Sequence, residues 1–296
     1  MRLVQFETTD GDGTGTSDKS RRRIGVELGS GGDIVDITSY DPSLPTNTRD
    51  FIAGGENALE AARRAVQSGK NVLPRKQLKI LAPIDNPEKL ICIGMNYHDH
   101  CSEQNIPVPE EPVVFSKFNN TITGPTDNIK YPSETKELDW EVELAIIIGK
   151  EGKNIVKEDA LKYVYGYTVA HDVSARDWQL QRNGKQFLIG KSMDGFCPLG
   201  PAIVTKDEIG DPEHLRLWTK VNDVYKQDSN TSQLVFKVAD VVEFLSRFIT
   251  LQPGDVILTG TPPGVGVFRK PPEFLQIGDV VEVGIEGIGV LVNKIV

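Results

Sequence analysis

The first 83 residues have the apolar pattern of a small α/β domain. Three short apolar runs predict strands at residues 1–7, 21–29 and 32–38. A polar, glycine-rich loop over residues 8–20 joins the first two runs. Apolar positions at helical spacing among good helix formers predict a helix over residues 57–67, and Gly69 is expected just beyond its end. We therefore expect a small N-terminal α/β domain over residues 1–83.

From residue 90 onward the pattern changes to many short apolar runs separated by Gly, Pro, Asn and Asp. These runs predict strands at residues 90–97, 112–118, 144–149, 165–173, 202–205, 217–224, 255–260 and 280–296. Helical spacing is rarer and predicts helices at residues 157–163, 176–181 and 237–248. Many short strands with few helices favour a β-rich sandwich, barrel or roll over repeating βαβ units. The predicted fold class is therefore α+β and β-rich, with a catalytic-sized domain over residues 84–296.

Composition and charge narrow the set of partners. The chain has 296 residues, of which 39% are hydrophobic and 25% charged, as in an ordinary soluble globular protein. No apolar run approaches the roughly 20 residues that span a bilayer, so we expect no membrane partner. The net charge of −9 argues against a nucleic-acid partner, which would require a basic face.

The cysteines and the first residues bear on the cellular compartment. Cys92, Cys101 and Cys197 form no C-x-x-C pair, which disfavours a disulfide framework or a thiolate zinc site and suits a reducing compartment. The sequence begins with a strand-like pattern rather than a secretory signal. We therefore expect that the protein is not secreted.

Two glutamates stand at the mouth of a predicted buried strand. Glu141 and Glu143 border the apolar run Leu144–Ile148, and because side chains alternate along a strand, both carboxylates point to one face. Asp172 ends another strand-like run. Three acidic groups in one place repel unless a cation compensates them, and oxygen ligands are what Mg²⁺, Mn²⁺ and Ca²⁺ prefer. A metal site is one interpretation, and a solvated strand edge paired with Lys or Arg is the other.

A histidine and a glutamate three positions apart form a second candidate. If His100 and Glu103 lie on one helical turn, the carboxylate raises the basicity of the imidazole and selects its tautomer, as proton transfer requires. A structural or surface histidine is the alternative, and composition alone favours it. The remaining histidines are interpreted as structural or surface residues.

Two glycine-containing segments complete the candidate chemistry. Lys191 follows a glycine in a predicted strand-to-loop setting, where it could be a surface charge or could hold a substrate oxygen. Residues 255–266 run from a strand into a Gly/Pro-rich loop without the phosphate-loop pattern G-x-x-x-x-G-K-[ST]. The backbone N–H groups of this loop and the Thr261 hydroxyl could face an anionic ligand, or the loop could be a simple tight turn.

The order of these motifs along the chain resembles the fumarylacetoacetate hydrolase superfamily. The motifs H-x-x-E, E-x-E, D-x-x-x-R-D-x-Q, G-K-S and L-T-G-T-P follow one another from about residue 90 to the C-terminus. The segments most similar to the subgroup called fumarylacetoacetate hydrolase domain-containing protein 2 are residues 94–105, 169–186 and 254–272. The resemblance implies a mixed β-roll catalytic domain that follows a small N-terminal domain, in a homodimer.

The resemblance also implies roles for individual residues. Members of the superfamily hold Mg²⁺ or Mn²⁺ with carboxylates that match Glu141, Glu143 and Asp172. The family positions that contact the substrate match Arg176, Gln179 and Thr261. A catalytic dyad on a lid segment that the ligand orders matches His100 and Glu103, and a lysine that stabilises enolate charge beside the metal matches Lys191.

The chemistry that this set implies is that of an enolate. A divalent cation chelated by the 1-carboxylate and 2-oxo oxygens of a 2-oxo acid acts as a Lewis acid and stabilises the enolate. We therefore expect a Mg²⁺-dependent enzyme that acts on small 2-oxo (di)carboxylic acids, and the subgroup resemblance implies tautomerisation of oxaloacetate from enol to keto. C–C hydrolysis of acylpyruvates and oxaloacetate decarboxylation are alternatives, and a metal-binding protein without turnover is a further one. Relatives of the subgroup are mitochondrial, so we expect the mitochondrial matrix or, because no Arg-rich leader is visible, the cytoplasm.

Overall fold

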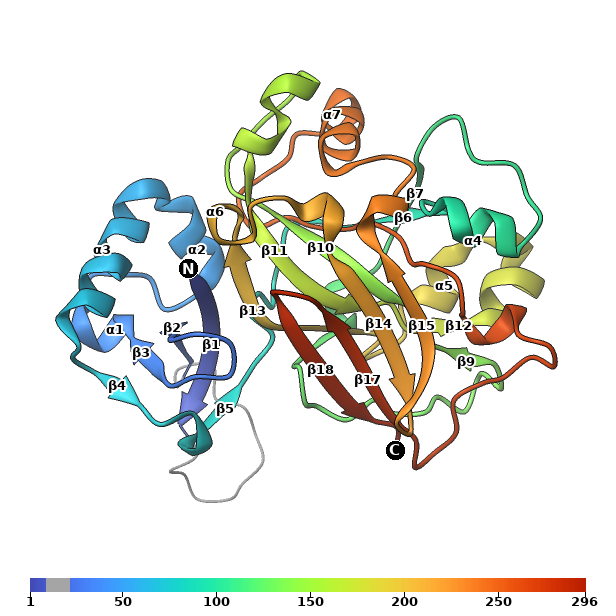
Figure 1. Ribbon diagram of the computed structural model, residues 1–296, viewed down its shortest axis with the longest axis horizontal. Helices are drawn as coiled ribbons and strands as arrows, with labels where there is room; N and C mark the ends of the chain where they lie inside the picture. Colours follow the sequence, from blue (N-terminus) through green and yellow to red (C-terminus); the bar gives the residue numbers. More distant parts are fainter. Residues whose placement is uncertain (9–21) are drawn as a thin grey trace.

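A computed structural model of the protein describes residues 1–8 and 22–296, and strands dominate it (Figure 1). The strands are β1 (Arg2–Thr8), β2 (Arg23–Glu27), β3 (Ile34–Asp36), β4 (Val72–Leu73), β5 (Leu78–Ile80), β6 (Leu90–Gly94), β7 (Val113–Ser116), β8 (Ile122–Thr123), β9 (Leu138–Asp139), β10 (Val142–Ile148), β11 (Val164–His171), β12 (Ser174–Ala175), β13 (Cys197–Thr205), β14 (Arg216–Val221), β15 (Val224–Asn230), β16 (Val256–Leu258), β17 (Val280–Ile285) and β18 (Gly289–Lys294). The α-helices are α1 (Ile37–Tyr40), α2 (Thr48–Ala53), α3 (Gly55–Ser68), α4 (His98–Glu103), α5 (Phe187–Lys191), α6 (Lys206–Ile209) and α7 (Val238–Phe248). The predicted α+β, β-rich fold class is confirmed, whereas the glycine-rich loop predicted at residues 8–20 lies, apart from its first residue, outside the described residues.

Within the described residues, the largest sheet has twelve strands and continues across most of the molecule. Its order is β4-β3-β2-β1-β13-β11-β10-β16-β6-β7, with β5 beside β1 and β8 beside β13. The pairs β16–β6 and β13–β8 are parallel and the other pairs are antiparallel, so the sheet is mixed. Because β1 pairs with β13, the N-terminal strands extend the sheet of the remaining chain (Figure 1). The predicted domain boundary near residue 83 therefore remains a prediction.

A second sheet, in the order β15-β14-β17-β18, packs against one face of the first (Figure 1). Strand β10 is buried on both of its faces. The side chains that pack in the cluster shared with the second sheet are those of Val142, Leu144, Ile146 and Ile148. Ala145 and Ile147 pack in the other cluster, and Glu143 shares their face because side chains alternate along a strand. The alternation therefore directs Glu143 away from the second sheet.

Helix α3 matches the helix that the sequence predicts, whereas two shorter predicted helices are of a different helical type. Helix α3 covers the predicted helix at residues 57–67, and Gly69 ends it in the left-handed conformation with φ of 64°. The segment predicted at residues 157–163 is a 3₁₀ helix, Lys157–Lys162, and not an α-helix. The segment predicted near residue 176 is a five-residue π-helical turn, Asp177–Gln181. Among the described residues, no helix combines the length and apolarity needed to cross a bilayer.

Helix α5 corrects the expected setting of Lys191, which ends this helix rather than a strand. A helix of five residues has little intrinsic stability, so its position depends on packing. Gly190 permits that packing because a Cβ atom there would lie 2.7 Å from Gln179 N and 2.8 Å from Ala175 O. Both of these neighbours are backbone atoms, which cannot rotate away as a side chain would.

We expect Gly190→Ala to lower the free energy of unfolding by about 1–3 kcal/mol, the usual range for an overpacked interior position. The extra methyl group would push α5 away from the π-helical turn and displace Lys191. Urea denaturation monitored by tryptophan fluorescence measures the change. Ile189→Ala, at a neighbouring position that is 43% exposed, is the control and should change the free energy by less than about 1 kcal/mol. Equal stability of Gly190→Ala and the parent protein would contradict the expectation.

Candidate active site

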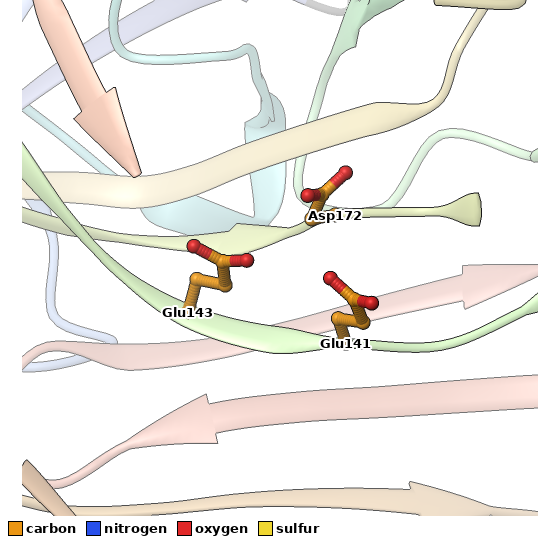
Figure 2. Close-up of side chains that lie close together, drawn as sticks. All are labelled: Glu141, Glu143 and Asp172. Carbon is orange, nitrogen blue, oxygen red and sulfur yellow. The ribbon is translucent and has the colours of Figure 1, made fainter. Parts of the chain in front are cut away.

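Three buried carboxylates converge where strands β10 and β11 lie side by side (Figure 2). Glu141 and Glu143 project from one side of β10 toward Asp172, which follows β11 (Figure 2). The Asp172 N–H donates to Glu141 O at 2.9 Å, which aligns the ends of the two strands. One carboxylate oxygen from each residue lies within 4.8 Å of the others, and the residues are 6%, 2% and 0% exposed, respectively. The convergence expected from the sequence is therefore present, and it is not at a solvated edge.

Two buried lysines offset part of this negative charge. Lys191 Nζ lies 2.8 Å from Glu141 Oε2 and 2.8 Å from Asp172 Oδ2. Lys117 Nζ donates to Asp172 Oδ1 at 2.5 Å and to Val173 O at 3.1 Å. Sequence reasoning selected Lys191 and missed Lys117, which follows an apolar strand and has no distinguishing spacing from the acidic residues.

Arg176 connects the acidic cluster to a neighbouring loop. Its Nη2 atom lies 2.7 Å from Glu141 Oε1, and its Nη1 atom donates to Gln179 Oε1 at 2.8 Å. Its Nε atom donates to Asp139 Oδ2 at 2.7 Å. The Asp139 carboxylate also accepts the two backbone N–H groups of residues 266–267, at 2.7 and 3.0 Å. Asp139, which sequence reasoning missed, therefore fixes the guanidinium and the loop relative to each other.

Burial and neighbouring charges shift the pKa values of Glu141 and Glu143 in opposite directions. Burial raises the pKa of Glu141, but the nearby Lys191 and Arg176 outweigh it and lower that pKa to about 2. Burial together with the negative charges of Asp172 and Glu141 raises the pKa of Glu143 well above its ordinary value. Without a further cation, Glu143 therefore retains a proton more readily than Glu141 does.

The carboxylate cluster fits a divalent metal ion that prefers oxygen ligands. One oxygen from each of the three carboxylates lies within 4.8 Å of the others, so small side-chain rotations can bring all three to the metal–oxygen distances of about 2.0–2.6 Å that such ions require. Each carboxylate oxygen has two lone pairs, so one hydrogen bond from a lysine or arginine leaves room for a metal. The raised pKa of Glu143 also indicates that the site lacks positive charge. A divalent cation would supply that charge.

His100 and Glu103 both lie on helix α4 and contact each other. His100 Nδ1 is 3.0 Å from Glu103 Oε2, so Nδ1–H donates a hydrogen bond to the ionised carboxylate. The other oxygen, Glu103 Oε1, accepts the Gly264 N–H at 3.0 Å. The His100 ring is 6% exposed and faces the Phe268 ring, with 5.9 Å between the ring centroids. His100 is therefore buried and held in one orientation, and it is not a surface residue.

Most of the predicted site residues line one cavity. The polar residues predicted from the sequence that line it are His100, Glu141, Glu143, Arg176, Gln179, Lys191 and Thr261. Its apolar wall includes Ile93, Phe115, Leu180, Phe187 and Phe268. Asp172 and Glu103 lie behind the lining and contact Lys191 and His100, respectively. The structure therefore brings together all nine residues that the sequence selected.

The Thr261 hydroxyl forms two hydrogen bonds within the protein that the sequence did not reveal. It donates its one hydrogen to Val142 O at 2.9 Å and accepts from Gln227 Nε2 at 2.8 Å. Gln227 Oε1 in turn accepts the Val142 N–H at 3.0 Å. In this arrangement the Thr261 hydroxyl has no hydrogen left to donate to a ligand, and a role in substrate contact remains a prediction.

Comparisons with known proteins agree with the motif order and with the fold. A family model described as fumarylacetoacetate (FAA) hydrolase C-terminal matches residues 89–296. The chain belongs to the fumarylacetoacetate hydrolase family. The mitochondrial oxaloacetate tautomerase fahd2 of Xenopus laevis is 57% identical over 296 residues, which cover 100% of this chain and 90% of that protein.

Solved structures of family members confirm the fold class. Fumarylacetoacetate hydrolase from Exiguobacterium antarcticum is 39% identical, with a TM-score of 0.84 over 100% of this chain and 99% of that chain. Maleylpyruvate hydrolase from Sphingobium sp. SYK-6, in complex with manganese(II) ion and pyruvate, is 30% identical with a TM-score of 0.79 and the same coverage.

We expect Mg²⁺ or Mn²⁺ binding to release a proton and to tighten as the pH rises. The reason is that Glu143 holds a proton above the ordinary carboxylate pKa, and a metal ligand must lose it. Calorimetric titration of the metal into the protein, in buffers with different ionisation heats, counts the released protons. Glu143→Gln cannot release this proton and should bind the metal more weakly. Identical heats in all buffers, with an affinity that does not depend on pH, would contradict the expectation.

Proposed function

We propose that the protein is a divalent-metal-dependent oxaloacetate tautomerase that converts the enol form to the keto form. The observation that carries the proposal is that the carboxylate cluster and His100 line the same buried cavity. Support also comes from the full-length similarity to curated relatives named oxaloacetate tautomerase. The superfamily contains isomerases and hydrolases, so enzymatic turnover is favoured over metal binding alone.

The metal would be held by Glu141, Glu143 and Asp172, and we propose Mg²⁺ because all three ligands are hard oxygen donors. When bound, the ion supplies Lewis acidity toward the 1-carboxylate and 2-oxo oxygens of the substrate. The similarity to a manganese-containing hydrolase makes Mn²⁺ the first alternative, and Ca²⁺ has the same ligand preference.

His100 and Glu103 move the proton in this proposal. Because Nδ1–H donates to Glu103, the other ring nitrogen, Nε2, is free of a proton and can act as the base. Nε2 takes the proton of the enol hydroxyl and returns it to C3, while Glu103 stabilises the intervening imidazolium. No water is consumed, which suits a cavity whose wall contains several aromatic rings.

Lys191 and Arg176 bind and orient the substrate in this proposal. Burial lowers the pKa of Lys191, but Asp172 and Glu141 outweigh it and raise that pKa, so the ammonium stays charged. The two cations line the cavity, where they can face the carboxylates and the developing enolate oxygen of a small dianion. Gln179 holds the Arg176 guanidinium in place at 2.8 Å.

C–C bond hydrolysis is the second candidate function. The similarity to maleylpyruvate hydrolase in complex with manganese(II) ion and pyruvate supports it, because hydrolysis of an acylpyruvate would use the same residues. His100 would then activate a water molecule rather than return a proton to the substrate. Decarboxylation of oxaloacetate is the third candidate, and it releases CO₂ where tautomerisation leaves the carbon skeleton intact.

Relatives named as mitochondrial support a location in the mitochondrial matrix, with the cytoplasm as the alternative. The family resemblance also supports a homodimer. We expect light scattering at two protein concentrations to give about twice the monomer mass of 32.6 kDa, since an interface that is stable at both concentrations leaves little monomer. A mass equal to that of the monomer at both concentrations would contradict the homodimer.

We expect His100→Asn to lower kcat/KM for enol-oxaloacetate by about 10²–10⁴-fold, because the variant lacks the group that accepts and returns the proton. The decay of enol absorbance, corrected for the spontaneous rate without enzyme, measures tautomerisation. Metal affinity should be preserved in His100→Asn and lost in Glu143→Ala.

Equal rates for the parent protein, His100→Asn and Glu143→Ala would reject the proposed activity. Product analysis distinguishes the alternatives, since pyruvate from oxaloacetate indicates decarboxylation and pyruvate from an acylpyruvate indicates hydrolysis. Tight binding of oxalate without any product from this substrate panel would favour a metal-binding protein without turnover.

A further inference from the structure

Gln104 contacts the nitrogen that the proposed reaction needs. It follows helix α4 as its C-cap residue, and its Nε2 atom lies 2.8 Å from His100 Nε2. The side chain also lines the cavity. Nothing in the motif order marks this residue, because the H-x-x-E pattern ends one position earlier at Glu103.

The direction of this hydrogen bond follows from the other side of the ring. An ionised Glu103 carboxylate can only accept, so His100 Nδ1 bears the ring proton and Nε2 presents a lone pair. The Nε2 lone pair can only accept a hydrogen bond, and the NH₂ group of the Gln104 carboxamide donates it. The imidazole is therefore held at both nitrogens, by an acceptor on one side and by a donor on the other.

We propose that Gln104 is a positioning residue that keeps His100 Nε2 free of a proton and aimed into the cavity until substrate displaces the carboxamide. The contribution to turnover rests on the proposed tautomerase function, whereas the hydrogen bond itself can be measured without turnover. A donor on Nε2 stabilises the neutral imidazole and opposes its protonation. The base is thus held ready for the proton of the enol.

A carboxamide suits this position because its NH₂ group can donate both to His100 Nε2 and, more weakly, to Met95 Sδ, which lies 3.9 Å from Gln104 Nε2. A protonated Nε2–H would lose the first of these contacts, so the carboxamide in this orientation favours the neutral imidazole. Glutamate in its place could only accept and would favour the imidazolium. Methionine has a similar length but cannot donate, and its sulfur accepts only weakly.

The other charged groups near His100 come from its own helix and from the cavity. Glu103 and Asp99 lie on the same helix, and Asp99 Oδ1 accepts the His100 backbone N–H at 3.0 Å. Glu141, which directly precedes β10, lines the same cavity as His100. Phe268, from the loop that covers the ring, has no charge. Lys191 and Arg176 line the same cavity, and both are paired with carboxylates in the described structure. These groups stay in place when only Gln104 is changed, so a shift between variants reports the Gln104 hydrogen bond.

The test compares the full-length protein with Gln104→Met and Gln104→Glu, all in the same Mg²⁺ concentration. The protein is labelled with ¹³Cε1-histidine, and the signal of His100 is assigned among the four histidines by its loss in His100→Asn. In Gln104→Met, the midpoint of the His100 titration should move upward by about half a unit to one unit, the value of one neutral hydrogen bond. In Gln104→Glu it should move further in the same direction. The acidic limb of kcat/KM should move with it.

Gln181→Met is the matched control, because Gln181 is exposed and donates to Glu137 rather than to His100. It should leave the His100 titration unchanged, and thermal unfolding of each variant verifies that the fold is intact. Identical His100 titrations in the parent protein and in Gln104→Met would overturn the proposal whether or not the enzyme turns over. The expected shift in a protein without tautomerase activity would sustain this proposal and reject the proposed function instead.

Discussion

Repulsion among three buried carboxylates is the constraint on which the rest of the site depends. Pairing of β10 with β11 brings Glu141 and Glu143 next to Asp172, away from the water that would otherwise screen them. Cationic side chains from separate segments offset part of this charge, namely Lys117, Lys191 and Arg176. In the proposed function, a divalent cation between the carboxylates would complete the compensation, and a dianionic substrate would balance that cation in turn.

The same network of charges determines where the neighbouring loop lies. Arg176 contacts Glu141 through Nη2 and Asp139 through Nε, and Asp139 accepts the backbone N–H groups of residues 266–267. That loop includes Phe268, which packs beside the His100 ring. One connected set of hydrogen bonds therefore fixes both the carboxylate cluster and the part of the cavity wall beside His100.

The alternation of side chains along a strand predicts which face of the sheet a residue lies on, but not which strand is its neighbour. It therefore predicts that Glu141 and Glu143 share a face, while the addition of Asp172 depended on the order of motifs. Lys117 escaped detection because it approaches Asp172 only in the folded chain. Asp139 is close to Glu141 in sequence, but its partners, Arg176 and residues 266–267, are distant in sequence. Gln104 lies four positions after His100, and it was missed because the H-x-x-E pattern ends at Glu103. Short helices such as α5 were missed for a related reason, since five residues give too little periodicity and packing at Gly190 determines their position.

Helix α4 places His100 and Glu103 on an element that is weakly stable by itself. It has six residues and begins without a side-chain cap. Two contacts tie it down, one from Ser229 Oγ to Asp99 at 2.7 Å and one from Gly264 N–H to Glu103 at 3.0 Å. Glu103 therefore orients the base with one oxygen and anchors the helix with the other. The three clustered carboxylates lie on or next to long buried strands, whereas His100 lies on a short helix whose position depends on these two tertiary contacts.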